Sequence, residues 1–414
     1  MIDARGRSAP DVGWRMTAVL AALLAFALIV SLIGWQAGRR RAVLPLLQAD
    51  FAGVAWTDLP ASSVPVPEVP ELGDSTMIND ALTDLARLSS GQATVAGMNR
   101  PWRKVWPRDS AFVAVAFART GHQDEAIEQI DFLQQVQGSD GTFHARYLPD
   151  TGLPPDDRGI QLDGTGWAMW ATRHVAQELP NPDRQQFLDD HGQLIDRSTR
   201  KLLAVAAEPE LPISPDYWEV AERRPTLATA AVLAAGLDAA AQLAVLRGQG
   251  SEAATLDQAA DDFRSKIISS FGTDGFPRRL GGSADSVDLG LAFLMPPFAA
   301  PDDPFAAPDD VVAAAWQDAP AQMARPAGGL APGGSWRKDG ISWTNATATA
   351  AMVDAAAGNR DRAIRWLRWI DAHRTPAGSI PEKVLWDGRP AAVAPLAWSA
   401  AAVVIAATEL DRTS

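Results

Sequence analysis

Residues 207–250 read AEPELPISPDYWEVAERRPTLATAAVLAAGLDAAAQLAVLRGQG, and this stretch contains the pattern that decides the fold. A long loop rich in proline, aromatic and charged residues leads into an Ala/Leu-rich run. The apolar spacing of that run predicts a helix over residues 224–247. The helix stops at Gly248-Gln249-Gly250, a tight turn typical of two antiparallel helices. The unit to look for elsewhere is therefore a long loop, a helix and a tight turn.

Apolar residues recur at helical spacing along the whole chain after Ser75, whereas strand patterns are scarce. The spacing predicts twelve helices, over residues 75–90, 109–120, 122–137, 163–179, 183–206, 224–247, 251–271, 285–295, 309–324, 342–357, 359–374 and 395–411. Tight connections follow the second, fourth, sixth and tenth helices. A long loop precedes every even-numbered helix: 91–108, 138–162, 207–223, 272–284, 325–341 and 375–394.

Short turns at one end of helix pairs and long loops at the other are what a closed ring of helical hairpins requires. We therefore predict an all-α fold, an (α/α)6 toroid of six helical hairpins preceded by one N-terminal transmembrane helix. The long loops would gather at one end of the ring, where the even-numbered helices begin and offer free N–H groups to a ligand. An open helical solenoid is the alternative, and it would lack both the closure and the crowded rim.

The predicted transmembrane helix is a run of 23 uncharged residues, Met16 to Gly38, between Arg15 and Arg39-Arg40-Arg41. Such a helix is roughly 35 Å long, enough to cross a bilayer. The run is too long for a signal peptide and lacks a good cleavage site. We expect a membrane anchor with basic flanks (1–41), a Pro-rich linker (42–74) and a catalytic domain (75–414). Three arginines flank each end of the run, so the positive-inside rule does not choose an orientation in the membrane. A single N-terminal anchor before a large domain is nevertheless typical of a single-pass protein whose domain is extracytoplasmic.

Composition excludes several functions. The 414 residues include no cysteine, which rules out disulfides and thiolate chemistry, and five histidines without a metal-binding spacing. We therefore expect no metal and no cofactor. After residue 41 the chain holds 31 basic and 48 acidic residues, a net charge of −17. Such a surface repels nucleic acid, so we expect no nucleic-acid partner.

The 207–223 loop contains Asp216-Tyr217-Trp218-Glu219, in which two carboxylates flank two large aromatic residues. An aromatic wall removes water from Glu219, which disfavours the charged form and raises its pKa towards the working pH, as a general acid needs. An aromatic anchor beside an exposed glutamate is the alternative interpretation.

The other long loops contain residues suited to sugar hydroxyls. Arg108 and Asp109 combine a planar donor fork with an acceptor, beside the apolar face of Trp106. Asp109 and Asp163 are also plausible helix caps, and Gln161 is free to bind. Seven of fifteen tryptophans lie in or beside the long loops, namely Trp102, Trp106, Trp218, Trp336, Trp343, Trp386 and Trp398. Indole gathered beside Arg, Asp and Glu favours a sugar-binding funnel.

These residues also match a known family, because residues 75–411 resemble the glucoamylase-like glycoside hydrolases of family 15 and their six-hairpin relatives. Residues 106–109 (WPRD) look like the family's glucose-gripping motif, and residues 215–219 (PDYWE) look like its general-acid motif. Residues 381–384 (PEKV), followed by 395–399 (PLAWS), look like its general-base segment.

The resemblance implies an inverting glycoside hydrolase that acts on α-linked oligo- or polysaccharide, with Glu219 as the general acid and Glu382 as the base. The substrate-binding residues would be Trp106, Arg108, Asp109, Gln161, Asp163, Trp218, Arg337, Trp343 and Trp398. The family often places a second acidic residue directly after the acid, whereas Val220 stands there in this chain. The sequence therefore does not identify which sugar the enzyme binds.

The residues themselves also favour glycoside hydrolysis. Glu219 would protonate the leaving oxygen, and Glu382, kept ionised by Lys383, would activate water on the opposite face. Inversion needs the carboxyl groups about 6.5–9.5 Å apart, and retention about 5–5.5 Å. Two alternatives remain: a catalytically silent, membrane-tethered glycan-binding protein, and a lyase or epimerase. A lyase or epimerase would need a His or Tyr base, and His144 with Tyr147 is the only such pair in a long loop.

Overall fold

The computed structural model describes residues 44–51, 59, 62, 64–89, 93–299 and 311–412. The predicted transmembrane segment, residues 16–38, lies outside the described residues. Within the described part, Leu227–Leu246 is long and apolar enough to cross a membrane, but it is mostly buried. A helix that is apolar all round and covered by protein is a core helix.

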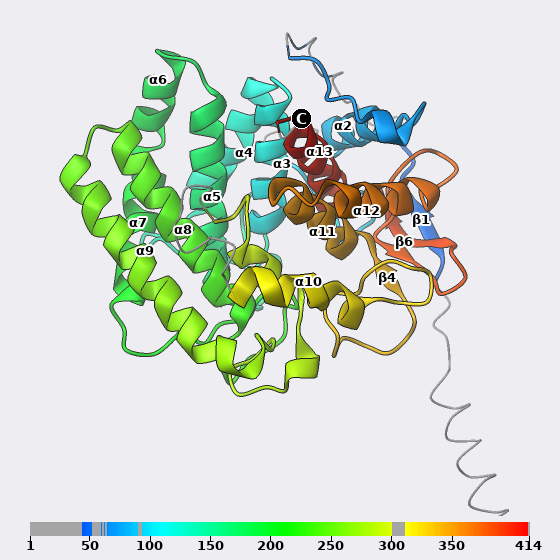
Figure 1. The fold of residues 1–414 in the computed structure, drawn as a ribbon. Coiled ribbons are helices and arrows are strands. Elements are labelled where there is room, and N and C mark those ends of the chain that lie inside the picture. Colours follow the sequence, from blue (N-terminus) through cyan, green and yellow to red (C-terminus); the bar gives the residue numbers. More distant parts are fainter. Residues whose placement is uncertain are drawn as a thin grey trace, which may run out of the picture. The chain divides into compact units, whose positions relative to one another are not determined.

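Six elements form an inner ring. They are α3 (Pro107–Arg119), α5 (Asp163–Glu178), α8 (Leu227–Leu246), the 3-10 helix η4 (Leu289–Leu294), α11 (Thr344–Ala356) and α13 (Ala397–Arg412) (Figure 1). Each element contacts the next in this order, and the last, α13, contacts the first, α3. The ring is therefore closed, which confirms the toroid and excludes the open solenoid.

A second layer of helices surrounds this ring. It contains α2 (Met77–Leu88), α4 (Gln123–Val136), α6 (Asp183–Asp190), α7 (Gly192–Ala206), α9 (Gly250–Phe271), α10 (Val311–Met323) and α12 (Arg360–Ala372). The outer helix α9 buries 7 of its 22 residues, whereas the inner helix α3 buries all 13. An inner helix is packed on every side, so its sequence is apolar or small all round, while an outer helix needs only one apolar stripe.

Two inner helices, α5 and α8, approach each other closely because their contact is made by glycine. A Cβ atom on Gly166 would lie 2.1 Å from the carbonyl oxygen of Val232, and one on Gly236 would lie 2.7 Å from the Cα of Gly166. Any side chain at these positions would force the two backbones apart.

Two predicted helices differ in the structure. The helix predicted over 183–206 is divided at His191, whose ring nitrogens bond Phe187 O at 2.8 Å and Asp131 Oδ1 at 3.0 Å. Gly192, a poor helix former, follows directly. The α-helix predicted over 285–295 is instead two short 3-10 helices, η3 (Ala284–Ser286) and η4. Pro296-Pro297 stops η4, since proline cannot continue a helix.

Short strands accompany the long loops. A four-stranded sheet has the order β1 (Leu46–Gln48), β6 (Pro390–Ala394), β5 (Lys383–Val384) and β4 (Ser342–Trp343), with only the β1–β6 pair parallel. β2 (Phe143–His144) pairs antiparallel with β3 (Ile160–Gln161). Single 3-10 turns complete the chain at η1 (Pro70–Leu72) and η2 (Gly272–Asp274).

The first strand corrects the predicted domain boundary. β1 falls inside residues 42–74, which the sequence assigns to a linker. Ala392 N donates to Pro45 O at 2.9 Å and Ala49 N to Ala394 O at 2.7 Å, so this segment belongs to the sheet. The compact unit accordingly starts at Leu44.

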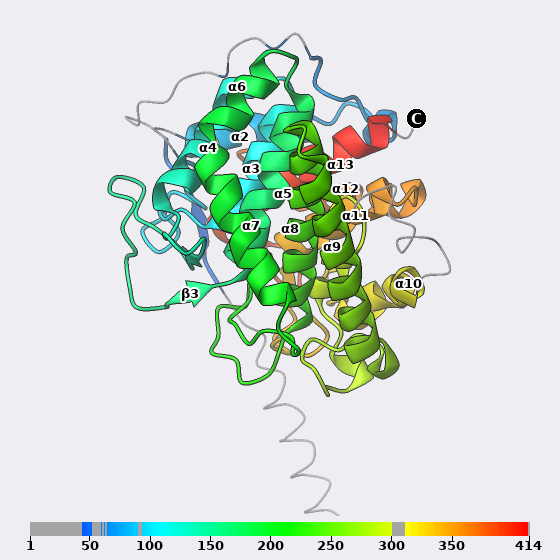
Figure 2. The same ribbon diagram turned by 90° about the vertical axis from the view of Figure 1, so that its left-hand side faces the viewer.

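The two ends of the ring differ as the loop lengths predict. Figure 2 shows the turn region around α6 at one end and β3 with the long loops at the other. The long loops precede the N-termini of α3, α5, α8, α11 and α13, so this end carries both the irregular chain and the free helix N–H groups.

Candidate active site

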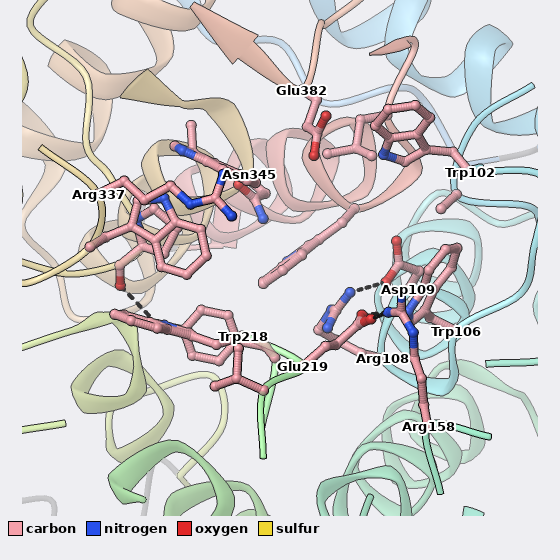
Figure 3. A pocket seen from close by; sticks show the side chains of 18 residues that line it. Trp102, Trp106, Arg108, Asp109, Arg158, Trp218, Glu219, Arg337, Asn345 and Glu382 are labelled. Atoms are coloured by element: carbon pink, nitrogen blue, oxygen red, sulfur yellow. Dashed lines mark hydrogen bonds and ion pairs between the residues drawn. The ribbon is translucent and has the colours of Figure 1, made fainter. Parts of the chain in front are cut away.

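A cavity of about 380 Å³ opens among the long loops. Figure 3 shows its lining, with Glu382 and Glu219 on opposite walls. Nine predicted site residues line it: Trp106, Arg108, Asp109, Trp218, Glu219, Arg337, Trp343, Glu382 and Trp398. Segments far apart in sequence therefore meet at one cavity of the size that binds small molecules.

Glu382 is held by its backbone between β6 and α11. Its N–H donates to Val393 O at 2.8 Å, and its carbonyl accepts from Thr344 N at 3.1 Å. Burial raises the pKa of the Glu382 carboxyl, although Lys383, with Nζ 3.3 Å from Oε2, and the Trp102 indole act in the opposite direction. Lys383 thus favours the ionised carboxylate, as expected, while burial raises its pKa by more than Lys383 lowers it. A carboxylate more basic than usual suits a general base.

Glu219 has an unusual backbone and two side-chain partners. Its φ is +53°, and its N–H donates to Asp216 O at 2.8 Å. Trp106 Nε1 donates to Oε1 at 2.6 Å, and Arg158 forms an ion pair with Oε2. Both contacts favour the charged carboxylate. The predicted aromatic residues Tyr217 and Trp218 line the cavity with Glu219, and these two polar contacts are additional to them.

A buried arginine fixes the loop that carries Glu219. Arg278 is 1% exposed and donates to both oxygens of Asp216, at 2.6 and 2.7 Å, and to Glu222 at 2.8 Å. Its guanidinium carbon lies 3.8 Å from the ring centroid of Trp218. Burial raises the pKa of Asp216, and the charge of Arg278 opposes this. Glu222 thus turns to the arginine, and Val220 lines the cavity instead.

Tyr217 is fixed on the other side of the same loop. Its hydroxyl lies 2.8 Å from Pro332 O and 3.0 Å from Asp288 Oδ2. Asp288 also caps η4 by accepting from Gly290 N, and burial raises its pKa to about 7. The aromatic pair beside Glu219 is therefore anchored by Arg278 under Trp218 and by Asp288 and the Pro332 carbonyl at Tyr217.

Arg108 and Asp109 lie in the first turn of α3, which begins at Pro107, so Asp109 is not the N-cap. Arg108 donates to Asp109 Oδ2 at 2.9 Å, and its guanidinium lies 4.4 Å from the Trp398 ring centroid. Burial raises the pKa of Asp109, and Arg108 opposes the shift. A charged pair stacked on an indole is well placed to hold adjacent sugar hydroxyls.

The structure does not bring Gln161 and Asp163 into the main cavity. Both line a neighbouring space of about 10 Å³, behind Arg108. Gln161 Nε2 donates to Asp216 O at 3.3 Å and so supports the loop of Glu219. Burial raises the pKa of Asp163 to about 7 against the charge of Arg108. Because α5 begins at Asp163 itself, this residue is not the N-cap either.

Among the other residues that line the cavity, four carry polar groups at positions that the sequence did not single out as binding: Trp102, Arg158, Trp336 and Asn345. Trp102 and Trp336 were visible as loop tryptophans. Arg158 lies in a Pro/Asp-rich segment, and Asn345 in the first turn of α11, where no motif marks them.

The loop pair expected for a lyase or epimerase base is not in this cavity. His144 N donates to the hydroxyl of Tyr147 at 2.7 Å, and Tyr147 is only 2% exposed. Burial raises the pKa of Tyr147 to about 12, and neither residue lines the cavity.

Several known proteins with similar sequences or folds are glycosidases. The model of glycosyl hydrolases family 15 matches residues 144–355. Isomaltose glucohydrolase of Kribbella flavida is 29% identical over 309 residues, which cover 70% of this chain and 75% of that protein.

Solved structures share the fold. A wild-type glycosidase has a TM-score of 0.67 at 24% identity, over 82% of this chain and 97% of that chain. A bacterial glucoamylase complexed with acarbose has a TM-score of 0.66 at 19% identity, over 84% and 57% of the two chains. The glucoamylase of Saccharomycopsis fibuligera has a TM-score of 0.65 at 15% identity, over 83% and 94%. Because the family model matches more than half of the sequence, the chain belongs to glycosyl hydrolases family 15 and is a glycoside hydrolase.

Proposed function

We propose that the protein is an inverting exo-hydrolase that removes a terminal α-linked glucose, with Glu219 as the general acid and Glu382 as the general base. The observation that carries this proposal is the position of both carboxyl groups on opposite walls of one cavity of about 380 Å³ (Figure 3). The relative named for isomaltose, and a structural neighbour solved in complex with glucose, support glucose as the terminal sugar.

The reaction needs one proton donor and one proton acceptor. Glu219 gives its proton to the glycosidic oxygen as the C1–O bond breaks. Glu382 takes a proton from a water molecule whose oxygen bonds to C1 from the other face, and exchange with solvent restores both groups. Trp106 donates to Oε1 of Glu219 at 2.6 Å, so its N–H orients the carboxyl group.

The walls of the cavity favour attack at a chain end. Arg108, Asp109 and Trp398 are each less than 10% exposed and form one side of the cavity. Arg108 and Asp109 provide donors and an acceptor for the hydroxyls of the terminal sugar. In the part of the chain that the structure describes, the indole N–H groups of Trp336 and Trp343 have no protein partner. An oxygen-rich ligand would satisfy such donors.

The test is the loss of turnover in Glu219→Gln and Glu382→Gln, each assayed on isomaltose and other α-linked disaccharides. We expect both variants to lose at least a hundredfold in kcat, the lower range for one acid or base, and to keep sugar binding by calorimetry. Glu210→Gln, an exposed glutamate in the same 207–223 loop, is the matched control and should retain full activity. Undiminished kcat in either active-site variant would end the assignment.

We further propose that residues 16–38 anchor the enzyme in a membrane with the catalytic domain on the extracytoplasmic side. The uncharged 23-residue run supports this. Activity that stays with washed membranes, and is released by deleting residues 1–43, is the expected result. Activity of the full chain in the soluble fraction would contradict it.

A further inference from the structure

Arg158 occupies a place beside Glu219 that no sequence motif marks. It precedes β3, and its guanidinium pairs with Oε2 of Glu219 inside the cavity (Figure 3). Its Nε also lies 3.5 Å from Oδ2 of Asp156. The side chain is 40% exposed, so the guanidinium lies between the cavity and solvent.

This contact fits only one protonation state of Glu219. Trp106 N–H bonds Oε1 and the guanidinium bonds Oε2, so both carboxyl oxygens accept. A guanidinium has five donors and no acceptor. A protonated carboxyl must point one O–H at the glycosidic oxygen, and that O–H cannot face a guanidinium. The general acid must carry its proton before the bond breaks, so one partner has to move.

Arg158 is the partner that can move. The Trp106 indole is 7% exposed, and it can keep donating to Oε1 after Oε2 is protonated. Arg158 lies between Gly152 and Gly159, both at positive φ, in the segment that joins β2 to β3. Asp156 offers it a second carboxylate, which also bonds Arg146.

We propose that Arg158 switches the protonation state of the general acid: it pairs with Glu219 in the empty site and keeps it ionised, and the leaving-group side of a bound substrate displaces it onto Asp156. Glu219 then takes one proton from solvent, so the acid is loaded only when substrate is present. This inference rests on the proposed role of Glu219.

Other charged groups around the cavity have other partners or lie on other walls. Arg108 of α3 bonds Asp109, and Lys383 of β5 pairs with Glu382. Arg337, before β4, lies over the Trp336 ring, and Arg278 beneath the loop is bonded by Asp216 and Glu222. Among the described residues, Arg158 is thus the cation that contacts Glu219.

The test compares two pH profiles. The profile of kcat/KM reports the free enzyme and that of kcat reports the enzyme–substrate complex. We expect the alkaline limb of kcat/KM in the unmodified enzyme to lie below that of kcat. In Arg158→Gln the alkaline limb of kcat/KM should move to higher pH by about one unit, the smallest pKa shift expected from an arginine beside a carboxyl. The alkaline limb of kcat should stay at the same pH. Arg158→Lys keeps the charge and should restore the original profile.

Two further variants make the test specific. Asp156→Asn removes the alternative partner, so Arg158 should stay on Glu219 and the alkaline limb of kcat should fall towards that of kcat/KM. Arg100→Gln removes an exposed charge from the 91–108 loop and should move neither limb. Thermal unfolding of each variant shows whether it is folded.

Two outcomes would overturn the switch. If both limbs of Arg158→Gln coincide with those of the unmodified enzyme, Arg158 does not control the acid. If both limbs move equally, Arg158 stays on Glu219 in the complex and is not displaced. Either result with an inactive Glu219→Gln variant refutes the switch alone, whereas an active Glu219→Gln variant refutes the proposed function itself.

Discussion

Replacing Arg278 with methionine is expected to weaken both the fold and the position of Glu219. The buried guanidinium bonds Asp216 at 2.6 and 2.7 Å and Glu222 at 2.8 Å. Methionine has a similar length but no charge, so the variant fills the space and leaves three carboxylates, of Asp216, Glu222 and Asp288, without this cation. Removing one partner of a buried ion pair costs about 3–5 kcal/mol.

The cost of this substitution should depend on pH. Burial raises the pKa of Asp216, and Arg278 and the Trp218 N–H lower it, so the loss of Arg278 should raise this pKa further. A carboxyl whose pKa is higher in the folded than in the unfolded state contributes stability at low pH and loses it as the pH rises through its folded pKa. The destabilisation by Arg278→Met should therefore be smaller at pH 5 than at pH 8.

Urea unfolding at pH 5 and pH 8, together with kcat, measures the effect. At pH 8 we expect Arg278→Met to lose about 3–5 kcal/mol and to lower kcat, because Asp216 O holds the Glu219 N–H at 2.8 Å. Arg279→Met is the matched control. Its side chain is 35% exposed and pairs with Glu222, so it should lose no more than about 1 kcal/mol. Equal stability of the two variants at both pH values, with unchanged kcat, would refute the reasoning.

Three further variants test other parts of the structure. Because burial raises the pKa of Glu382, the acidic limb of the pH profile of kcat/KM should have an apparent pKa above the usual 4.5. Lys383→Met should move this apparent pKa higher, and a lower apparent pKa in the variant would contradict the account. Gly166→Ala should cost about 1–3 kcal/mol in urea unfolding, whereas a Cβ on Gly250 meets nothing within 4 Å and Gly250→Ala should cost nothing. Deleting residues 1–51 removes β1 and should lower kcat relative to deleting residues 1–43, and equal kcat would show that β1 does not support the base.

The ring could be predicted because its signal is repeated. The sequence has long loops before every even-numbered helix and tight turns after most of them. This alternation predicts a closed ring of helical hairpins, and the contact of α13 with α3 confirms it. The predicted helix over 285–295 failed because its apolar spacing does not distinguish an α-helix from a 3-10 helix ended by two prolines. β1 was missed because three residues paired with a distant strand leave no local pattern.

The candidate site was predictable where its residues form local motifs. Glu219 and Glu382 sit in short aromatic or proline-rich segments, and both line the cavity. Gln161 lies in a comparable segment, but its side chain supports the Glu219 loop from behind. Arg278 and Arg158 carry no local signal, because their importance comes from contacts with residues about 60 positions away.

The most direct test of two glutamates acting from opposite sides of one cavity is the anomeric form of the first product. Proton NMR during the hydrolysis of isomaltose should show β-glucose first, because water held by Glu382 attacks the face opposite to the bond that Glu219 protonates. If α-glucose forms first, the configuration is retained, and Glu382 does not act as the base of an inverting hydrolase.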